Sequence, residues 1–141
     1  MPARSYAWPQ GHWDWYQHLA FKHGVHAGDM AFVGGQVDKS PAGEPLHVAD
    51  LATQTAVVIR HIDTVLQEFG AGLANVVKLV AFYATDGRVD ETAFLTDIGR
   101  HILRHGGAPD GVGPAITLVP LPCLPLVVLL VSVERVAMTR S

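Results

Sequence analysis

A segment near the C-terminal end that lacks charge but contains many prolines restricts the fold of this chain more than any other feature. Residues 113–133 carry no charged side chain, which raises the question of a membrane-spanning helix. Four prolines interrupt the first half of the segment, and proline breaks the interior of a helix. The continuously aliphatic part, residues 126–131, has only the length of a strand. We therefore predict two buried strands joined by a proline-rich turn, and no membrane span.

The rest of the chain alternates short strands with two helical stretches. Strands are expected at residues 21–25, 31–37, 76–84, 115–119 and 126–136, and helices at residues 50–69 and 90–105. Gly28-Asp29 is a hairpin turn signal between the first two strands. Gly34-Gly35 in the second strand predicts a bulge, or a close approach of another backbone or a ligand.

Both helical stretches have one apolar face. The first repeats apolar or small positions at three- and four-residue steps, namely Leu51, Thr55, Val58, Ile62, Val65, Leu66 and Phe69, and the second does so with Phe94, Leu95, Ile98 and Ile102. The order β-β-α-β-α-β-β predicts one α+β domain over residues 1–141, with a mixed sheet and both helices packed on one face. The other face of such a sheet is too apolar here for water, so we expect oligomerisation to bury it.

Composition excludes several classes of function. The net charge is −3 and the ten basic residues are scattered, so no basic surface for nucleic acid is expected. The single cysteine, Cys123, cannot form an intramolecular disulfide, which favours a reducing compartment. Residues 1–10 contain Trp8, Pro9 and Gln10 where a signal peptide needs an apolar run. A cytoplasmic protein is the expectation.

Three blocks of sequence carry a family resemblance. The first is FKHGVHAGDMAFVGGQV at residues 21–37. The second combines DLATQT at 50–55, IDTVL at 62–66, GA at 70–71 and VVKL at 76–79, and the third combines PA at 114–115 with VSVE at 131–134 and Ala137. In this order and spacing they resemble the Rid (RidA/YjgF) family, which has a chorismate-mutase-like fold. The resemblance implies a homotrimer with three small-molecule clefts between subunits, and cofactor-free hydrolysis of enamines and imines to a 2-keto acid and ammonia.

The chain departs from the family pattern at four positions of the implied site. Ile116 stands where the resemblance implies an arginine that binds the substrate carboxylate, and isoleucine cannot form that pair. Ser132 stands in place of a glutamate that positions water, although Glu134 shares its strand face. Gly34 replaces a small hydroxyl residue and Phe21 replaces a tyrosine. The chain therefore resembles an arginine-lacking subgroup rather than a 2-imino acid deaminase.

These residues define the candidate site. As catalytic groups we predict His23, a general base or else a strand histidine bonded to backbone, and Glu134, a cleft carboxylate or else a surface partner of Arg135. The candidate ligand-binding residues are Phe21, Gly34, Gly35, Ile116 and Ser132. His101 and His105 have a spacing that can hold zinc, but no glutamate lies between them, so we expect neither a metal nor a cofactor.

Three functions stay open on sequence grounds. The first is an enzyme that hydrolyses or tautomerises a small, less acidic enamine-, imine- or amide-like compound with His23, Glu134 and a water. The second is a non-catalytic module that binds or senses a metabolite in the same cleft. The third, RNA cleavage, is opposed by the acidic net charge. The aromatic stretch at residues 13–18, within the N-terminal extension (residues 1–20), either folds over the cleft as a lid or covers an edge strand or the outer surface of the trimer.

Overall fold

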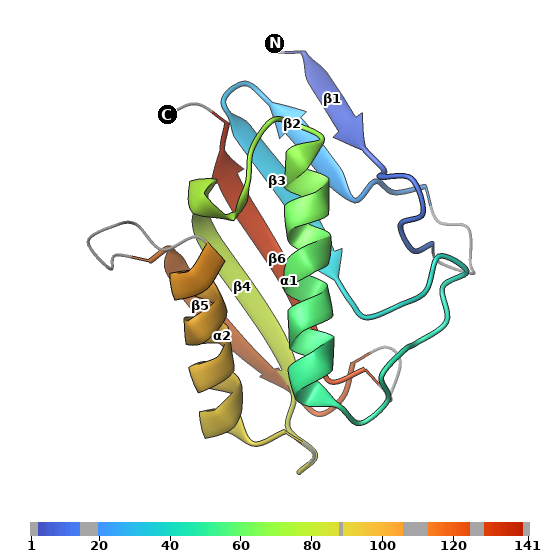
Figure 1. Cartoon of the computed structure of the whole chain (residues 1–141), viewed down its shortest axis with the longest axis vertical. Coiled ribbons are helices and arrows are strands. Elements are labelled where there is room, and N and C mark those ends of the chain that lie inside the picture. Colours follow the sequence, from blue (N-terminus) through green and yellow to red (C-terminus); the bar gives the residue numbers. More distant parts are fainter. Residues whose placement is uncertain (1–2, 15–19, 88, 106–112, 125–128, 140–141) are drawn as a thin grey trace.

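One twisted sheet with two helices against it forms the structure (Figure 1). The computed structural model describes residues 3–14, 20–87, 89–105, 113–124 and 129–139, with the backbone alone for 102–105. The strands are β1 (Arg4–Ala7), β2 (Gly24–Ala27), β3 (Met30–Gln36), β4 (Val76–Ala84), β5 (Ala115–Leu121) and β6 (Val131–Met138). The helices are α1 (Leu51–Gln67) and α2 (Glu91–His105), with a 3-10 turn η1 (Leu73–Asn75) between α1 and β4.

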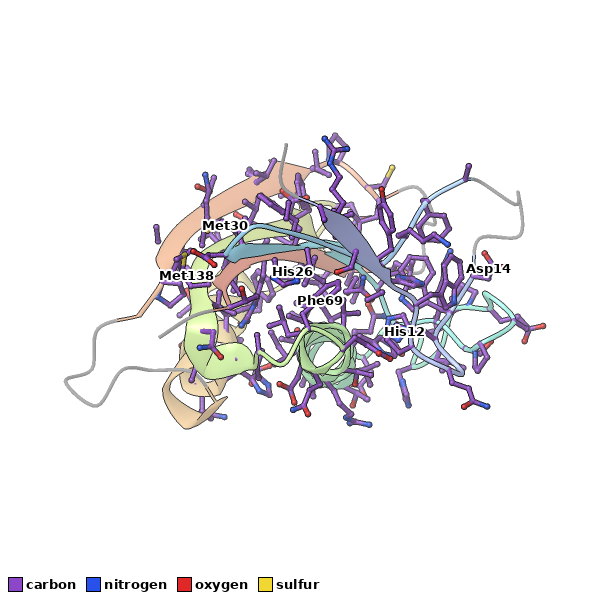
Figure 2. The ribbon with its side chains drawn as sticks, turned by 90° about the horizontal axis from the view of Figure 1, so that it is seen from above. His12, Asp14, His26, Met30, Phe69 and Met138 are labelled. Atoms are coloured by element: carbon purple, nitrogen blue, oxygen red, sulfur yellow. The ribbon has the colours of Figure 1, made fainter. Side chains whose placement is uncertain are left out.

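The sheet is mixed, and its last strand in sequence is central in space. The strand order is β1-β2-β3-β6-β4-β5, with β4 and β5 parallel and the other neighbours antiparallel. Both helices cover the same face, and Figure 2 shows no helix on the opposite face. The predicted α+β architecture, with a mixed sheet and two helices on one face, is confirmed.

The main core lies between the sheet and the helices. The buried face of α1 consists of Gln54, Thr55, Val58, Ile59, Ile62, Val65 and Leu66. It begins after Asp50, whose carboxylate accepts a hydrogen bond from the Thr53 amide at 3.0 Å, as an N-cap does. From α2, Phe94 and Ile98 reach the same core. The apolar stripe of α1 therefore faces the sheet, as the sequence pattern predicts.

A second, smaller cluster lies at one end of the sheet. It consists of buried Trp13, Val37, Leu124 and Leu129, with Phe21, Phe82 and Leu121 packed against them. Trp13 is only 2% exposed, although it belongs to the N-terminal extension. In addition, β1 pairs with β2 along its whole length. Residues 15–19, most of the aromatic stretch, lie outside the described residues, so its role as lid or structural cover stays a prediction.

The structure corrects several details of the predicted elements. The strand β1 was not expected, and the strand expected at residues 21–25 begins later, at Gly24. Of the two C-terminal strands predicted to be buried, β5 is an edge strand whose first three residues are exposed. Leu95, expected on the apolar face of α2, is 40% exposed. Residues 125–128, part of the last predicted strand, lie outside the described residues, and β6 itself begins at Val131.

The face without helices is apolar and open. Along β6 the buried residues alternate strictly with half-buried ones, because successive side chains point to opposite faces. Phe32 on β3 is 45% exposed and Val77 on β4 is 42% exposed. Met30 and Met138, which pair across β3 and β6, also lie side by side in Figure 2. The bare apolar face predicted from the sequence is therefore present.

Candidate functional site

The candidate site residues fall into three places in the chain. His23 and Phe21 lie beside the N-terminal extension, in and next to the second cluster. Gly34, Gly35, Ser132 and Glu134 lie on the face of the sheet without helices or in the bulge beside it. Ile116 lies apart, on the edge strand β5.

His23 is the centre of a buried hydrogen-bond network rather than a free base. Its Nε2 donates to the carbonyl of Trp13 at 2.7 Å, so the proton is on Nε2 and Nδ1 is the acceptor. Nδ1 lies 3.3 Å from the side-chain amide nitrogen of Gln36, which also donates to the carbonyl of Gly34 at 3.1 Å. His23 is 1% exposed, and both of its ring nitrogens are occupied. The general-base role stays a prediction, and it would require this network to open.

Gln36 connects the network to the extension. Its Oε1 accepts hydrogen bonds from Nε2 of His12 at 2.7 Å and from Nε1 of Trp13 at 3.1 Å. Gln36 itself is completely buried. All four hydrogen-bonding positions of this amide are therefore used, which is the condition under which a buried amide stabilises a fold.

Three imidazole rings pack together next to this amide. The ring centroids of His12 and His23 are 4.2 Å apart, and those of His12 and His61 on α1 are 4.6 Å apart. Burial lowers the pKa of His23 to about 4 and that of His61 to about 4, and it also lowers the pKa of His12. All three rings are therefore neutral near pH 7. Within the described ranges, no group of His, Cys, Asp or Glu side chains has the geometry to hold a metal ion.

Phe21 lines a hollow made largely by the extension. Its ring stacks near Trp13, with centroids 5.9 Å apart, and contacts Trp8 at 4.9 Å. The hollow has a volume of about 630 Å³, and its walls include Tyr6, Trp8, Asp14 and Lys22. Figure 2 shows Asp14 at the outer end of the molecule, beyond His12. The aromatic residues of the extension thus surround the position where the resemblance implies a tyrosine.

The glycine pair forms the predicted bulge. The register of β3 against β6 shifts between Val33 and Gln36, where the two glycines lie. A Cβ atom on Gly35 would lie 2.8 Å from Oγ of Ser132, so a side chain there would displace the serine. The predicted bulge is confirmed, and the group that comes close to Gly35 is the Ser132 side chain rather than another backbone or a ligand. Gly34, Gly35 and Ser132 are thereby brought together on one chain.

Glu134 lines a hollow of the bare face. This hollow has a volume of about 330 Å³, and its lining includes Phe32, Gly34, Lys78, Val80, Glu134 and Val136. Ser132 and Glu134 are both half-buried and alternate with buried Val133, so they share the face of the sheet, as predicted. The hollow combines one carboxylate and one ammonium group with apolar walls. Glu134 is therefore available to a ligand on this face.

Ile116 is far from these residues within one chain. It pairs in register with Leu79, whose side chain is completely buried on the helix side of the sheet. Paired residues of neighbouring strands point to the same face, so Ile116 and Ser132 are on opposite faces. Two strands, β6 and β4, separate β5 from β3. One chain does not bring Ile116 together with Ser132 or the glycine pair.

The structure also contains a histidine–carboxylate pair that could not be foreseen from the sequence. Nδ1 of His47 lies 2.7 Å from Oδ2 of Asp38, whose side chain is completely buried, whereas the His47 side chain is 44% exposed. The two residues are nine positions apart in a loop with no regular pattern. Nothing in the local sequence marks them as partners.

Comparison with known proteins identifies the family. The family model described as "Endoribonuclease L-PSP" matches residues 16–138. The chain belongs to the endoribonuclease L-PSP (YjgF/RidA) family. A curated RutC family protein of Pyrococcus abyssi is 32% identical to it over 62 residues, which are 44% of this chain and 49% of that protein. The chain thus spans about half the length of this curated relative.

Solved structures of this family share the fold. Yeast Mmf1 has a TM-score of 0.76 at 20% identity, covering 98% of this chain and 100% of that chain. The Escherichia coli YjgF gene product has a TM-score of 0.70 at 21% identity, covering 85% and 88%. E. coli TdcF, solved with bound serine, has a TM-score of 0.71 at 20% identity, covering 87% and 90%. The helices of the described part of this L-PSP family chain are too short or too polar to cross a membrane.

Proposed function

We propose that the protein is a homotrimer whose clefts between subunits bind a small metabolite. One observation carries the proposal: Ile116 and Ser132 lie on opposite faces of the sheet and on strands that are not neighbours. A second copy of the chain is needed to complete a site that contains both. The exposed apolar face, with Phe32 at its centre, supports assembly because such a face is seldom left in water.

The proposed ligand is neutral, or at least lacks a carboxylate next to its reacting carbon. Ile116 offers no donor, so an anionic 2-imino acid would leave its carboxylate unpaired in the cleft. In the proposed reaction, water adds to the carbon of an imine or of the imine tautomer of an enamine. The C–N bond then breaks, giving a carbonyl compound and ammonia. Glu134 and His23 are the predicted proton acceptors, and Glu134 has the more open position in the structure.

Ligand chemistry is tested by ammonia release from two freshly generated imines. One is 2-iminopropionate, and the other is phenylmethanimine, which has no carboxylate. The native protein is compared with Ile116→Arg and with Leu95→Arg, a matched control because Leu95 is another exposed aliphatic residue, at 40% against 46% for Ile116, and lies on α2. Light scattering first checks that the native mass is three times the 15.2 kDa of one chain.

We expect the native protein to hydrolyse phenylmethanimine and to leave 2-iminopropionate at its spontaneous rate. Ile116→Arg should gain activity on 2-iminopropionate by about tenfold or more, since a charged hydrogen bond contributes on the order of 1.5–3 kcal/mol. Leu95→Arg should gain none. Native activity on 2-iminopropionate equal to that of Ile116→Arg would show that another group binds the carboxylate, and a monomeric mass would overturn the intersubunit cleft.

A non-catalytic module is the second candidate. Four polar anchors of the family pattern are replaced at Phe21, Gly34, Ile116 and Ser132. Binding of a small metabolite without ammonia release from either imine would favour this candidate.

The prediction of a cytoplasmic location rests on the single cysteine, and the prediction of no nucleic-acid partner rests on the net charge of −3. RNA binding that disappears as salt is raised would contradict the second of these.

A further inference from the structure

In the Asp38–His47 pair a carboxylate holds an imidazole ring in one orientation, as in enzymes that use histidine as a general base. The carboxylate of Asp38 can only accept, so the 2.7 Å contact fixes the proton of the neutral imidazole on Nδ1. The lone pair is then on Nε2, the nitrogen that Asp38 does not bind. Such a carboxylate–histidine pair orients the ring and stabilises the cation formed when Nε2 takes a proton. With 44% of its side chain exposed, His47 can be reached by water and by small molecules.

Backbone hydrogen bonds in the loop hold His47 beside Asp38. The carbonyl of Asp38 accepts a hydrogen bond from the amide of Leu46 at 3.0 Å, which closes a small hairpin and places His47 beside the carboxylate. His47 has a φ of 45°, in the left-handed region that residues other than glycine seldom adopt. Its carbonyl is held by the amide of Asp50 at 3.1 Å and by the side chain of Gln54 at 3.2 Å. The ring is therefore fixed by its backbone as well as by Asp38.

The pair lies at the end of the sheet that carries the candidate site. Asp38 follows β3 by two residues, just beyond the glycine bulge. Gln54, which holds the carbonyl of His47, also accepts a hydrogen bond from the amide of Leu130 at 2.9 Å. Leu130 immediately precedes β6, two residues before Ser132. One side chain thus ties His47 to the strand on which the family pattern has its catalytic glutamate.

The other histidines with described side chains do not have this combination. Nε2 of His12 and both ring nitrogens of His23 are used inside the buried network, and Nε2 of His61 is buried. His26 contacts the hydroxyl of Thr139 at 3.0 Å, on the hairpin at the far end of β3. His101 lies on α2 with 16% of its side chain exposed, and its Nε2 is 3.9 Å from Asp97.

We propose that His47 is the general base of the proposed site and that Asp38 is its positioning residue. The proposal rests on the proposed hydrolysis of an imine. Nε2 of His47 removes a proton from water as the water oxygen bonds to the imine carbon, and the electron pair of the C=N bond moves to nitrogen. The imidazolium then returns the proton to this nitrogen, which gives a carbinolamine. Nε2 next takes the proton of the carbinolamine hydroxyl and delivers it to the same nitrogen, so that the C=O bond forms as the C–N bond breaks and ammonia leaves. No oxidant, reductant or cofactor is required.

The test measures two reactions in native protein, His47→Ala, Asp38→Asn and the control His26→Ala. Phenylmethanimine hydrolysis reports on the proposed function. Hydrolysis of p-nitrophenyl acetate, an activated ester that any accessible imidazole base attacks, reports on His47 independently of the natural substrate. Melting curves check that each variant is folded. Free imidazole is added to His47→Ala, and the rate of the same imidazole solution without protein is subtracted, because free imidazole itself hydrolyses the ester.

For both reactions we expect a loss of about 10²-fold or more in His47→Ala, the range in which a general base contributes. Imidazole should restore part of this loss, and His26→Ala should keep the native rate. In Asp38→Asn we expect kcat for the ester to fall while KM stays near its native value, since the ring is no longer oriented by the carboxylate. A purely structural role of Asp38 would lower the melting temperature and leave kcat of the folded protein unchanged.

The outcomes separate the two proposals. If native protein hydrolyses phenylmethanimine and a folded His47→Ala variant does so equally well, the general-base assignment is wrong and the proposed function stands. If native protein hydrolyses only the ester, and does so through His47, the assignment stands and the imine is the wrong substrate class. If native protein hydrolyses neither compound, or if imidazole restores nothing to His47→Ala, the assignment of His47 is overturned.

Discussion

At the scale of single residues, Gln36 connects the N-terminal extension with the sheet. Its amide binds the rings of His12 and Trp13 on one side, and His23 and the carbonyl of Gly34 on the other. Since these groups are buried, removing the amide would take a partner from two donors and two acceptors, and each buried group left unsatisfied costs about 1–3 kcal/mol. The extension is therefore held in place by polar contacts as well as by apolar packing.

The buried histidines next to Gln36 make the free energy of unfolding depend on pH. In the unfolded chain His23 and His61 take up a proton at their ordinary pKa of 6.5, whereas in the folded protein burial keeps the pKa of each at about 4. The unfolded state therefore binds more protons between these values, so the contribution to stability is complete above pH 6.5 and is lost as pH falls towards about 4. We expect the free energy of unfolding, measured in urea across this window, to fall with decreasing pH.

His61→Phe should flatten this pH dependence, because it removes one of the two groups and keeps an aromatic ring against His12. Gln67→Ala, on the exposed side of the same helix, removes no titrating group and should retain the native dependence. An unchanged slope in His61→Phe would mean that the folded ring takes up its proton as readily as the unfolded one.

Only some of these contacts could be predicted from the sequence. The bulge at Gly34-Gly35 has a local cause, since two glycines in a strand weaken regular pairing, and it was predicted correctly. The His47–Asp38 contact depends on a hairpin and on a positive φ at a histidine, neither of which has a reliable local signal. His23 was recognised as a candidate, but its partners Trp13 and Gln36 come from separate segments.

At the scale of elements, α1 and β2 approach each other closely at a glycine. A Cβ on Gly24 would lie 2.6 Å from Cγ1 of Val65 and 2.9 Å from the ring of Phe69. Val65 is completely buried and cannot move aside freely. The distance between this helix and the sheet is thus set by the absence of one methyl group.

Gly24→Ala should therefore lower the free energy of unfolding by about 1–3 kcal/mol, the usual effect of overpacking a core. Gly99→Ala on α2 is the matched control, because nothing lies within 4 Å of its added methyl group. It should stabilise the protein by about 0.5–1 kcal/mol, as alanine favours a helix interior over glycine. Equal effects of the two substitutions in chemical denaturation would contradict the close approach.

Elements with a strong periodic pattern were predicted within a few residues, and the others were not. The helix α1 and the strand β4 (Val76–Ala84) have continuous apolar patterns that burial explains. The strand β1 has only four residues, three of them exposed, and it exists because β2 offers it an unpaired edge. Leu95 fits the helical stripe of α2, yet α2 lies at the side of the sheet and buries only a narrow face.

At the scale of the whole molecule, the face without helices determines how the chain meets other copies. Phe32 and Val80 line its hollow together with the charged groups of Lys78 and Glu134. An apolar face of this kind is a frequent feature of subunit interfaces, in which polar groups accompany buried apolar ones.

Phe32→Glu should lower the mass of the native assembly, because it places a charge in the apolar part of the proposed interface. Leu95→Glu is the control: Leu95 is 40% exposed against 45% for Phe32, but it lies on α2, away from this face. Light scattering of both variants gives the comparison, with circular dichroism to check the fold. Loss of assembly in Leu95→Glu but not in Phe32→Glu would assign the interface to the helical side.

The position of β6 has a consequence for how the protein is made. Among the described strands, β6 comes last in the chain and lies between β3 and β4, which have no direct pairing with each other in the sheet order. During translation the ribosome therefore releases β1–β3 and β4–β5 first, and the six strands cannot form one sheet until residues 131–138 have left the exit tunnel. The glycine bulge and Ser132 come together only at that moment, so a nascent chain without residues 131–138 has no complete cleft.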